Sequence, residues 1–298
     1  MTDYSYNYDK PDALLTGYTT VRGAELKEIY RVLNSQGAVP KSALIERFGR
    51  PLSDDTTVEA DHVDECLKFL KAVDIIEVDA QNVVSLFNEG VYPDIQSFEA
   101  RLLHHIRQQT ENQYHLSFIF DVMADLDARR IPEEALLEAV KGDDETFDLT
   151  WRGEKIRMWA NLAETIGAIS YDNEDDENAI ITSPTRPLLH ELLQWHNQHG
   201  DDPKRFARAL EWIDDAFLPV FDDRPGVPSV TAGVADTIRN LEADGVVSLR
   251  AMSDTQDVVE LSRTQGGTEN VATFEVESAP DRPTYWYPLD RNERRFEA

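Results

Sequence analysis

The chain has 298 residues, of which 41% are hydrophobic, so it is long enough for two or three domains with buried cores. Its 57 acidic residues outnumber its 29 lysines and arginines and give a formal net charge of −28. The single cysteine, Cys66, excludes an internal disulfide and a zinc site built from cysteines.

The basic residues are mostly arginine, with 21 arginines and 8 lysines. An excess of carboxylates with few lysines resembles the proteins of salt-in halophiles such as haloarchaea, where salt screens repulsion between carboxylates within a few ångströms. The alternative is a generally acidic, partly disordered protein, but the apolar content and clear periodicity favour a folded one. In a halophilic protein bulk charge says little about the partner, so only local patches bear on nucleic-acid binding.

Residues 1–20 are predicted to form a flexible N-terminal arm. A first domain is predicted over residues 21–92, with two short helices followed by a third over residues 59–73. The leading end of this third helix carries Asp61 and Asp64, which suit a helix N-terminus but repel a phosphate backbone. We therefore do not expect this helix to read DNA.

A second domain is predicted over residues 96–202, and its central feature is a helix over residues 152–166. Apolar residues recur along it at helical spacing, and Gly167 is suited to a left-handed cap. Strands are predicted to begin at Ala168 and Ile180, on either side of the acidic loop 173–178. The sequence thus predicts a helix followed by a β-hairpin.

The helix over residues 152–166 has the most DNA-compatible surface in the sequence. Arginine and asparagine are the side chains that read guanine and adenine edges, and lysine contacts phosphates. The candidate DNA-binding residues on the helix are Arg152, Lys155, Arg157 and Asn161, and those expected to add phosphate contacts are Arg129, Arg130 and Arg186. The acidic loop contradicts this interpretation, because it would point four carboxylates at phosphates.

A third domain is predicted over residues 203–298. It contains a helix over residues 229–244 with Ser229 as its N-cap, a hairpin formed by residues 246–251 and 258–262, and a further strand over residues 271–276. An aromatic segment near the C-terminus, Pro-Thr-Tyr-Trp-Tyr-Pro, is expected to close a sheet edge or capture a partner.

The predicted helix-and-strand pattern occurs three times with the same internal offsets, which indicates an internal repeat. Its members are Val63, Leu67, Leu70, Asp74 and Ile76; Ile156, Ala160, Ala163, Gly167 and Ile169; and Val234, Ile238, Leu241, Gly245 and Val247. The three copies resemble tandem winged-helix (helix-turn-helix) proteins, as found in archaeal transcription regulators and in accessory subunits of chromosome-maintenance and phage-defence assemblies. The resemblance implies a mainly α fold with small β-hairpins (α+β) in three tandem winged-helix-like domains, and assigns no specific family.

The sequence offers no candidate catalytic site, cofactor or metal. It lacks a phosphate-binding Gly-rich loop, a dinucleotide fingerprint, a His-Glu-x-x-His motif and a Gly-x-Ser-x-Gly elbow, so we expect a protein that is not an enzyme. The histidines on predicted helices, namely His104, His105, His190, His196 and His199, are interpreted as polar surface residues rather than metal ligands. No apolar run approaches the roughly 18 residues of a membrane span, and no signal-peptide core is present, so a cytoplasmic protein is expected.

Two functional hypotheses remain. The first is a DNA-associated protein that places the helix over residues 152–166 in the major groove of double-stranded DNA, and the function of most winged helices favours it. The second is a non-catalytic adaptor that binds protein subunits of a larger assembly, which the acidic first and third copies favour.

Overall fold

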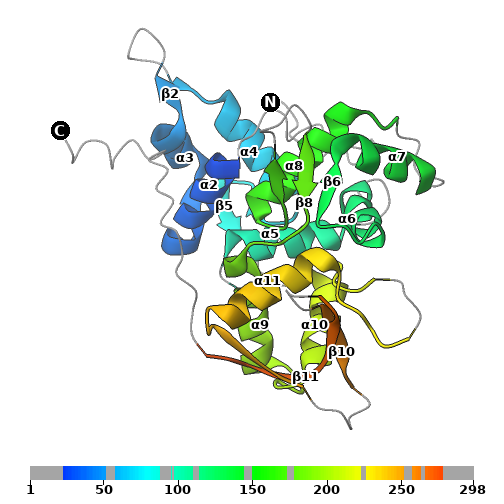
Figure 1. The fold of residues 1–298 in the computed structure, drawn as a ribbon. Helices are drawn as coiled ribbons and strands as arrows, with labels where there is room; N and C mark the ends of the chain where they lie inside the picture. The colour runs from blue at the N-terminus through cyan, green and yellow to red at the C-terminus, as the bar shows by residue number, and fades with distance from the viewer. Residues whose placement is uncertain are drawn as a thin grey trace. The chain divides into compact units, whose positions relative to one another are not determined.

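The computed structural model describes residues 23–51, 58–87, 95, 97–109, 114–143, 150–172, 178–222, 226–251, 257–262 and 266–277. The predicted N-terminal arm, most of the acidic loop 173–178 and the aromatic C-terminal segment lie outside these residues. The described chain is mixed α and β, with many helices and three small antiparallel sheets of three strands (Figure 1), in agreement with the predicted α+β class. It divides into two compact units, which comprise Met1–Pro93, Gln109–Gln113 and Pro283–Ala298, and Asp94–Gln108 and Tyr114–Arg282.

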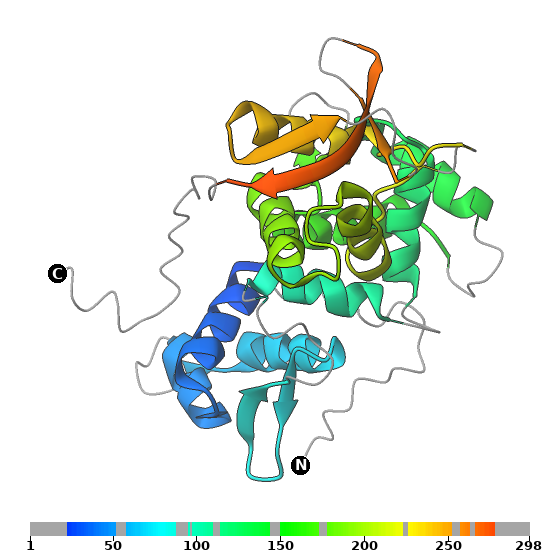
Figure 2. The ribbon, with the colours of Figure 1, turned by 90° about the horizontal axis from the view of Figure 1, so that it is seen from below.

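In the first unit, three helices pack with a small sheet. The helices are α2 (Gly23–Gln36), α3 (Lys41–Phe48) and α4 (Asp61–Ala72), and the strands are β1 (Val39–Pro40), β2 (Arg50–Pro51), β3 (Val58–Glu59), β4 (Ile76–Val78) and β5 (Val83–Leu86). The sheet has the order β1-β5-β4, and β2 pairs with β3. The β4–β5 hairpin (Figure 2) turns at Asn82, whose φ is 59°, and Asp79 Oδ1 accepts hydrogen bonds from the backbone N–H groups of Gln81 and Val83.

The first half of the second unit has a sheet with the same order of strands. Its elements are α5 (Phe98–Arg107), α6 (His115–Asp125), β6 (Arg130–Pro132), α7 (Glu133–Asp143), α8 (Gly153–Ile166), β7 (Ser170–Asp172) and β8 (Ala179–Ile181). The sheet order β6-β8-β7 places the last strand between the other two, as in β1-β5-β4. In both cases a helix and a strand are followed by two helices and a hairpin, although the β2–β3 pair lies between the two helices in the first unit.

The second half of this unit departs from the predicted hairpin. Its elements are α9 (Arg186–His199), α10 (Phe206–Ala216), α11 (Ala232–Ala243), β9 (Val247–Ala251), β10 (Val259–Ser262) and β11 (Thr268–Val276). The prediction that residues 246–251 pair with residues 258–262 is wrong, because β11 lies between β9 and β10 and is antiparallel to both. Gly266 and Gly267, with φ of 88° and 81°, turn the chain back directly onto β10. The nine-residue β11 then also pairs with β9, and it packs on α9 and α10 (Figure 2).

The internal repeat is confirmed at the level of helix, cap and strand. All its apolar members are buried. A left-handed residue lies one or two positions after each helix: φ is 56° at Asp74, 79° at Gly167 and 69° at Gly245. The next backbone N–H bonds the carbonyl five residues back at 2.9 Å in all three copies, and the left-handed residue bonds the carbonyl three residues back. This is the Schellman end of a helix, and a strand begins within three residues of it in each copy.

The expectation that the helical histidines are polar surface residues is wrong for four of them. His104, His105, His190 and His196 are buried, and only His199 is exposed. His104 Nδ1 lies 3.1 Å from the carbonyl oxygen of Ala216, and its ring packs on Phe217. Their rings fill space between helices, where spacing along one helix gives no signal. Among the described residues, no group of three or more His, Cys, Asp or Glu is placed to hold a metal ion.

The buried histidines predict that the protein loses stability in acid. Burial, then the charges of His104 and Arg101, lower the pKa of His105 from 6.5 to about 4. Below pH 6.5, His105 is therefore protonated in the unfolded chain but stays neutral in the folded chain. The stability is complete above pH 6.5 and falls as the pH drops toward 4. His105 alone is expected to lower the free energy of unfolding by about 2 kcal/mol between pH 7.5 and pH 5.

Urea unfolding at both pH values and constant salt checks this. The His105→Gln variant should lose about 2 kcal/mol less than the wild type over this interval. A His199→Gln variant, altered at an exposed histidine, should follow the wild type. An unchanged pH dependence in His105→Gln would show that His105 is not the group responsible.

Candidate functional site

Helix α8 spans Gly153–Ile166, as predicted, with Arg152 as its N-cap and Gly167 as its left-handed C-cap. One face is buried and carries Ile156, Trp159, Ala160, Leu162, Ala163 and Ile166. The opposite face carries four exposed side chains, Glu154, Arg157, Asn161 and Glu164. We call these four residues, together with Arg152, the α8 face. It holds two cations, two carboxylates and one amide.

The candidate residues on α8 differ in exposure. Arg152 and Asn161 are exposed, whereas Lys155 is half-buried. Within the described parts of the chain, Arg152 forms no ion pair. Arg152 is thus the candidate arginine best placed to contact an anionic partner.

Arg157 is held by a buried carboxylate. Its Nη1 donates to Glu133 Oε1 at 3.1 Å, and only 10% of the Glu133 side chain is accessible. Glu133 Oε2 accepts from the Tyr171 hydroxyl at 2.7 Å and from Asn178 Nδ2 at 3.3 Å. Burial, followed by the hydrogen bond to Glu133 and its negative charge, raises the pKa of Tyr171. The first residue of α7 therefore joins α8 to both strands of the β7–β8 hairpin.

The far end of α8 is joined to the same hairpin. Glu164 Oε1 accepts a hydrogen bond from the Tyr171 backbone N–H at 3.0 Å. Tyr171 is thus bonded through its backbone to the last turn of α8 and through its hydroxyl to Glu133. The hairpin and the α8 face are positioned together.

The other three candidate arginines also have carboxylate partners. Arg129 makes two hydrogen bonds to Asp236 of α11, at 2.5 and 3.1 Å, and this contact raises the pKa of Arg129. Arg186 pairs with Asp244, directly after α11, and Arg130 Nη2 lies 3.4 Å from Asp172 of β7. The sequence interpretation grouped these arginines with the α8 face. The structure instead pairs Arg129 with Asp236 in the first half of α11 and Arg186 with the residue that follows α11, and it pairs Arg130 with Asp172 across the β6-β8-β7 sheet.

Helix α11, the counterpart of α4 and α8 in the internal repeat, is largely buried. It packs on α9, β9 and β10. The side chain of Arg239 is only 11% accessible, and it bonds Glu242, Glu269 and the carbonyl oxygen of Ser262. Ser229 is not the N-cap: Thr231 occupies that position, and Asp127 Oδ1 accepts a hydrogen bond from the Ala232 backbone N–H at 2.8 Å. This helix is thus a structural element rather than a surface for a partner.

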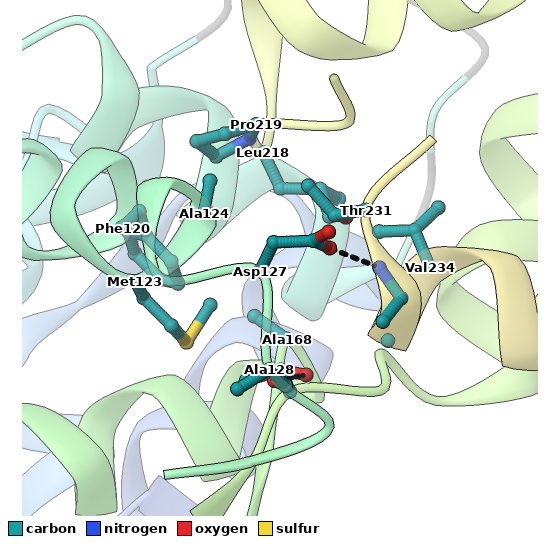
Figure 3. Close-up of a pocket in the computed structure, with 13 residues that line it drawn as sticks. Phe120, Met123, Ala124, Asp127, Ala128, Ala168, Leu218, Pro219, Thr231 and Val234 are labelled. Carbon is teal, nitrogen blue, oxygen red and sulfur yellow. Dashed lines mark hydrogen bonds between the residues drawn. The ribbon is translucent and has the colours of Figure 1, made fainter. Parts of the chain in front are cut away.

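A small cavity lies where α11 begins, beside the turn after α6 (Figure 3). Its volume is about 20 Å³, and Phe120, Met123, Asp127, Thr182 and Thr231 are among the residues that line it. This volume accommodates about one water molecule, whereas pockets for organic ligands measure roughly 300–1,000 Å³. The cavity is too small for a substrate or cofactor.

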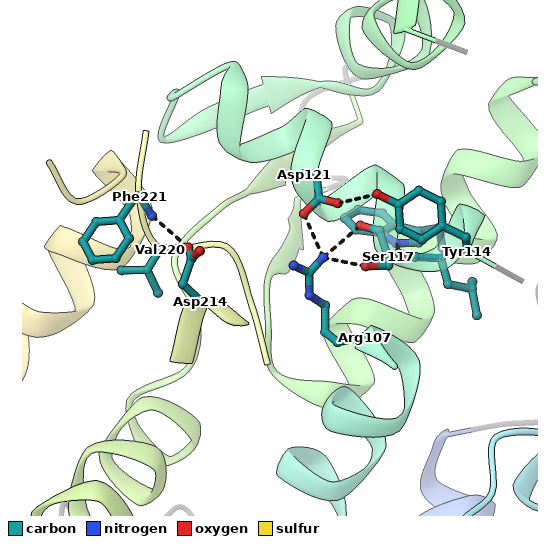
Figure 4. Close-up of polar contacts among 9 residues, drawn as sticks. Arg107, Tyr114, Ser117, Asp121, Asp214, Val220 and Phe221 are labelled. Atoms are coloured by element: carbon teal, nitrogen blue, oxygen red, sulfur yellow. Dashed lines mark hydrogen bonds and ion pairs between the residues drawn. The ribbon is translucent and has the colours of Figure 1, made fainter. Parts of the chain in front are cut away.

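Two further polar clusters are structural (Figure 4). Arg107 Nη1 donates to Ser117 Oγ at 2.6 Å and to Asp121 Oδ1 at 2.8 Å, which ties α5 to α6. Asp214 Oδ1 accepts from the backbone N–H groups of Val220 and Phe221 at 2.6 and 3.2 Å. Burial raises the pKa of Asp214, and these two backbone hydrogen bonds oppose the shift. Both clusters hold neighbouring segments of the chain together by local contacts and leave no site for a ligand among the residues that form them.

The residues that organise the α8 face were not found from the sequence. Glu133 follows Pro132 at the first position of α7, where an acidic residue is favourable in any helix, so its type carries no special signal. Within the described ranges, no helix combines the length and hydropathy needed to cross a bilayer. Comparison of the chain with protein-family models, with curated proteins and with solved structures gives no match.

Proposed function

We propose that the chain is a non-enzymatic tandem winged-helix protein that binds a protein partner through the α8 face, as an adaptor in a larger assembly. The sheet orders β1-β5-β4 and β6-β8-β7, each formed by a strand after the first helix and a hairpin after the third, support the winged-helix assignment. In this arrangement α4 and α8 are the third helices of their domains. The third copy is a variant in which β11 is inserted into the sheet.

The ion pairs of the candidate arginines favour a protein partner over DNA. Each of the four arginines Arg129, Arg130, Arg157 and Arg186 forms an ion pair with a carboxylate of its own chain. DNA affinity arises largely from cations that neutralise phosphates, and arginines already paired contribute little to it. A face with both signs of charge instead suits a polar protein interface, in which complementary charges fix the register of the partner.

DNA binding is the second candidate function, and the exposed Arg152 favours it. Arg152 stands at the start of α8, where backbone N–H groups and the helix dipole attract anions. On this hypothesis Arg152 and Asn161 would contact the duplex and Lys155 would support them.

A pair of measurements distinguishes the two functions. Fluorescence anisotropy with a 30-base-pair duplex, at the lowest KCl concentration that preserves the fold, is expected to show no saturable binding. A tagged chain expressed in its native cells is expected to recover a partner in constant stoichiometry. The Asn161→Trp variant, with a bulky side chain at the centre of the α8 face, should lose this partner, whereas Gln198→Trp at an exposed position of α9 should retain it.

The opposite outcome would favour the second candidate. Saturable binding of the wild type to the duplex, lost in Arg152→Glu, would show that the α8 face binds DNA. Retention of the partner by Asn161→Trp would remove the α8 face from the protein interface.

A further inference from the structure

We propose that Glu133 determines the specificity of the α8 face, because it supplies an internal anion where a DNA phosphate would otherwise bind. The inference rests on the proposed function, since it concerns which class of partner the same face accepts. It makes Glu133 a specificity-determining residue that acts through Arg157 and the first turn of α8.

The position of the Glu133 carboxylate carries the inference. Oε1 accepts from Arg157 Nη1, and an ideal Cβ built on Gly153 would lie 2.9 Å from the same oxygen. The carboxylate therefore lies directly against the first residue of α8. Two features that attract a phosphate, an arginine and a helix N-terminus, are thus both next to one internal negative charge.

Glu133 differs from the other paired carboxylates in how firmly it is held. The carboxylates of Asp172, Asp236 and Asp244 have accessible fractions of 31, 36 and 49%, and such exposed ion pairs are typically worth about 0–1 kcal/mol. These three carboxylates are therefore held more weakly than the carboxylate of Glu133. Glu133 accepts three side-chain hydrogen bonds in a site closed on the side of α8 by Gly153, so rotation of its carboxylate away from this site would break all three.

The chemical consequence is a preference between partner classes. The Arg157 side chain is half-exposed, and one of its nitrogens donates to Glu133. Its remaining N–H groups can donate to a neutral acceptor such as a backbone carbonyl or side-chain amide. A phosphate at the same place would lie close to the Glu133 carboxylate and be repelled by it. The α8 face therefore accepts a polypeptide segment that offers carbonyl oxygens, and it rejects nucleic acid.

The test is a gain of DNA binding in Glu133→Gln. Glutamine keeps the shape and the oxygen acceptor for Tyr171 and Asn178 but removes the charge. We expect Glu133→Gln to bind the 30-base-pair duplex saturably, at least about tenfold more tightly than the limit set by the absence of saturable wild-type binding, and with an affinity that falls as the KCl concentration rises. Adding Arg157→Gln to this variant should abolish the gain.

Two controls separate charge from structure. Glu138→Gln removes a charge from an exposed position of the same helix and should leave DNA affinity unchanged. Tyr171→Phe breaks a hydrogen bond to Glu133 but keeps the carboxylate, so it should lower thermal stability without raising DNA affinity. If Glu133→Gln does not fold, as judged by circular dichroism, Glu133→Ala replaces it with the same expected gain.

The outcomes are distinguishable from those of the proposed function. A folded variant without the charge that binds the duplex no better than the wild type would overturn the role of Glu133 and leave the adaptor function standing. An equal gain in Glu138→Gln or Tyr171→Phe would also overturn it. Tight duplex binding by the wild type would overturn the adaptor function itself.

Discussion

Replacing Trp159 with alanine is expected to lower the free energy of unfolding of the second unit by about 4 kcal/mol, within the range for removal of a buried aromatic side chain. Trp159 is 1% exposed and lies on the buried face of α8. Its Nε1 donates to the carbonyl oxygen of Leu116 at 3.1 Å, and its ring meets Phe120 edge-to-face with centroids 4.8 Å apart. Alanine would leave a cavity and would remove the hydrogen bond to the Leu116 carbonyl.

Urea unfolding followed by circular dichroism measures the effect, with Trp159→Phe as the conservative comparison. Phenylalanine keeps most of the ring volume but lacks the indole N–H, so it should cost about 1–2 kcal/mol. A Trp159→Ala variant within 1 kcal/mol of the wild type would mean that the buried face of α8 does not support the unit.

The helix that carries this tryptophan could be predicted from the sequence because its signals are local. Apolar residues at helical spacing defined its buried face, and Gly167 marked its end. Burial of Ile156 and Ala163 and a φ of 79° at Gly167 confirm both. Gly245 and Asp74 mark the ends of the other two repeat helices in the same way. A helix end of this kind needs one residue that tolerates a left-handed backbone, as both glycine and aspartate do.

Strand pairing in the third copy could not be predicted in the same way. Residues 258–262 can pair with the strand before or the strand after them, and an alternating pattern does not decide between these. The pair Gly266 and Gly267 was the available signal, since a tight turn favours pairing of the strands on either side. The structure uses that turn, and β11 consequently lies in the middle of the sheet.

The state of the candidate arginines was the least predictable feature. The sequence shows residue types on a helix face, but the carboxylate partner lies 24 positions away for Arg157, 58 for Arg186 and 107 for Arg129. These contacts depend on how α7 and α11 pack, which no local pattern encodes. The sequence can therefore predict which residue types lie on a helix face. Whether that face is cationic depends on the tertiary contacts of its charged side chains.

The second large effect is expected at Gly233, the second residue of α11. A Cβ atom there would lie 2.3 Å from Thr182 Oγ1 and 2.4 Å from the Thr182 carbonyl oxygen. Thr182 is fixed, because its backbone N–H donates to Arg129 and its hydroxyl donates to the carbonyl oxygen of Ala128. Gly233→Ala therefore requires α11 to move, which would disturb the Asp127 contact with its first turn. We expect a loss of about 3 kcal/mol, at the upper end of the usual range for overpacking, because both contacts are much shorter than van der Waals distance.

Gly142, in the last turn of α7, provides the matched control for Gly233→Ala. A Cβ on Gly142 would meet nothing within 4 Å, so Gly142→Ala should stabilise the protein by roughly 0.5 kcal/mol through helix propensity. Helix propensity alone predicts the same small increase in stability for both substitutions. Close packing of α11 on Thr182 instead predicts that Gly233→Ala lowers the stability while Gly142→Ala raises it. Urea unfolding of the two variants in the same salt decides between these. Similar stabilities would show that α11 is not packed tightly against residues 182–184, and the assignment of α11 as a buried structural helix would then fail.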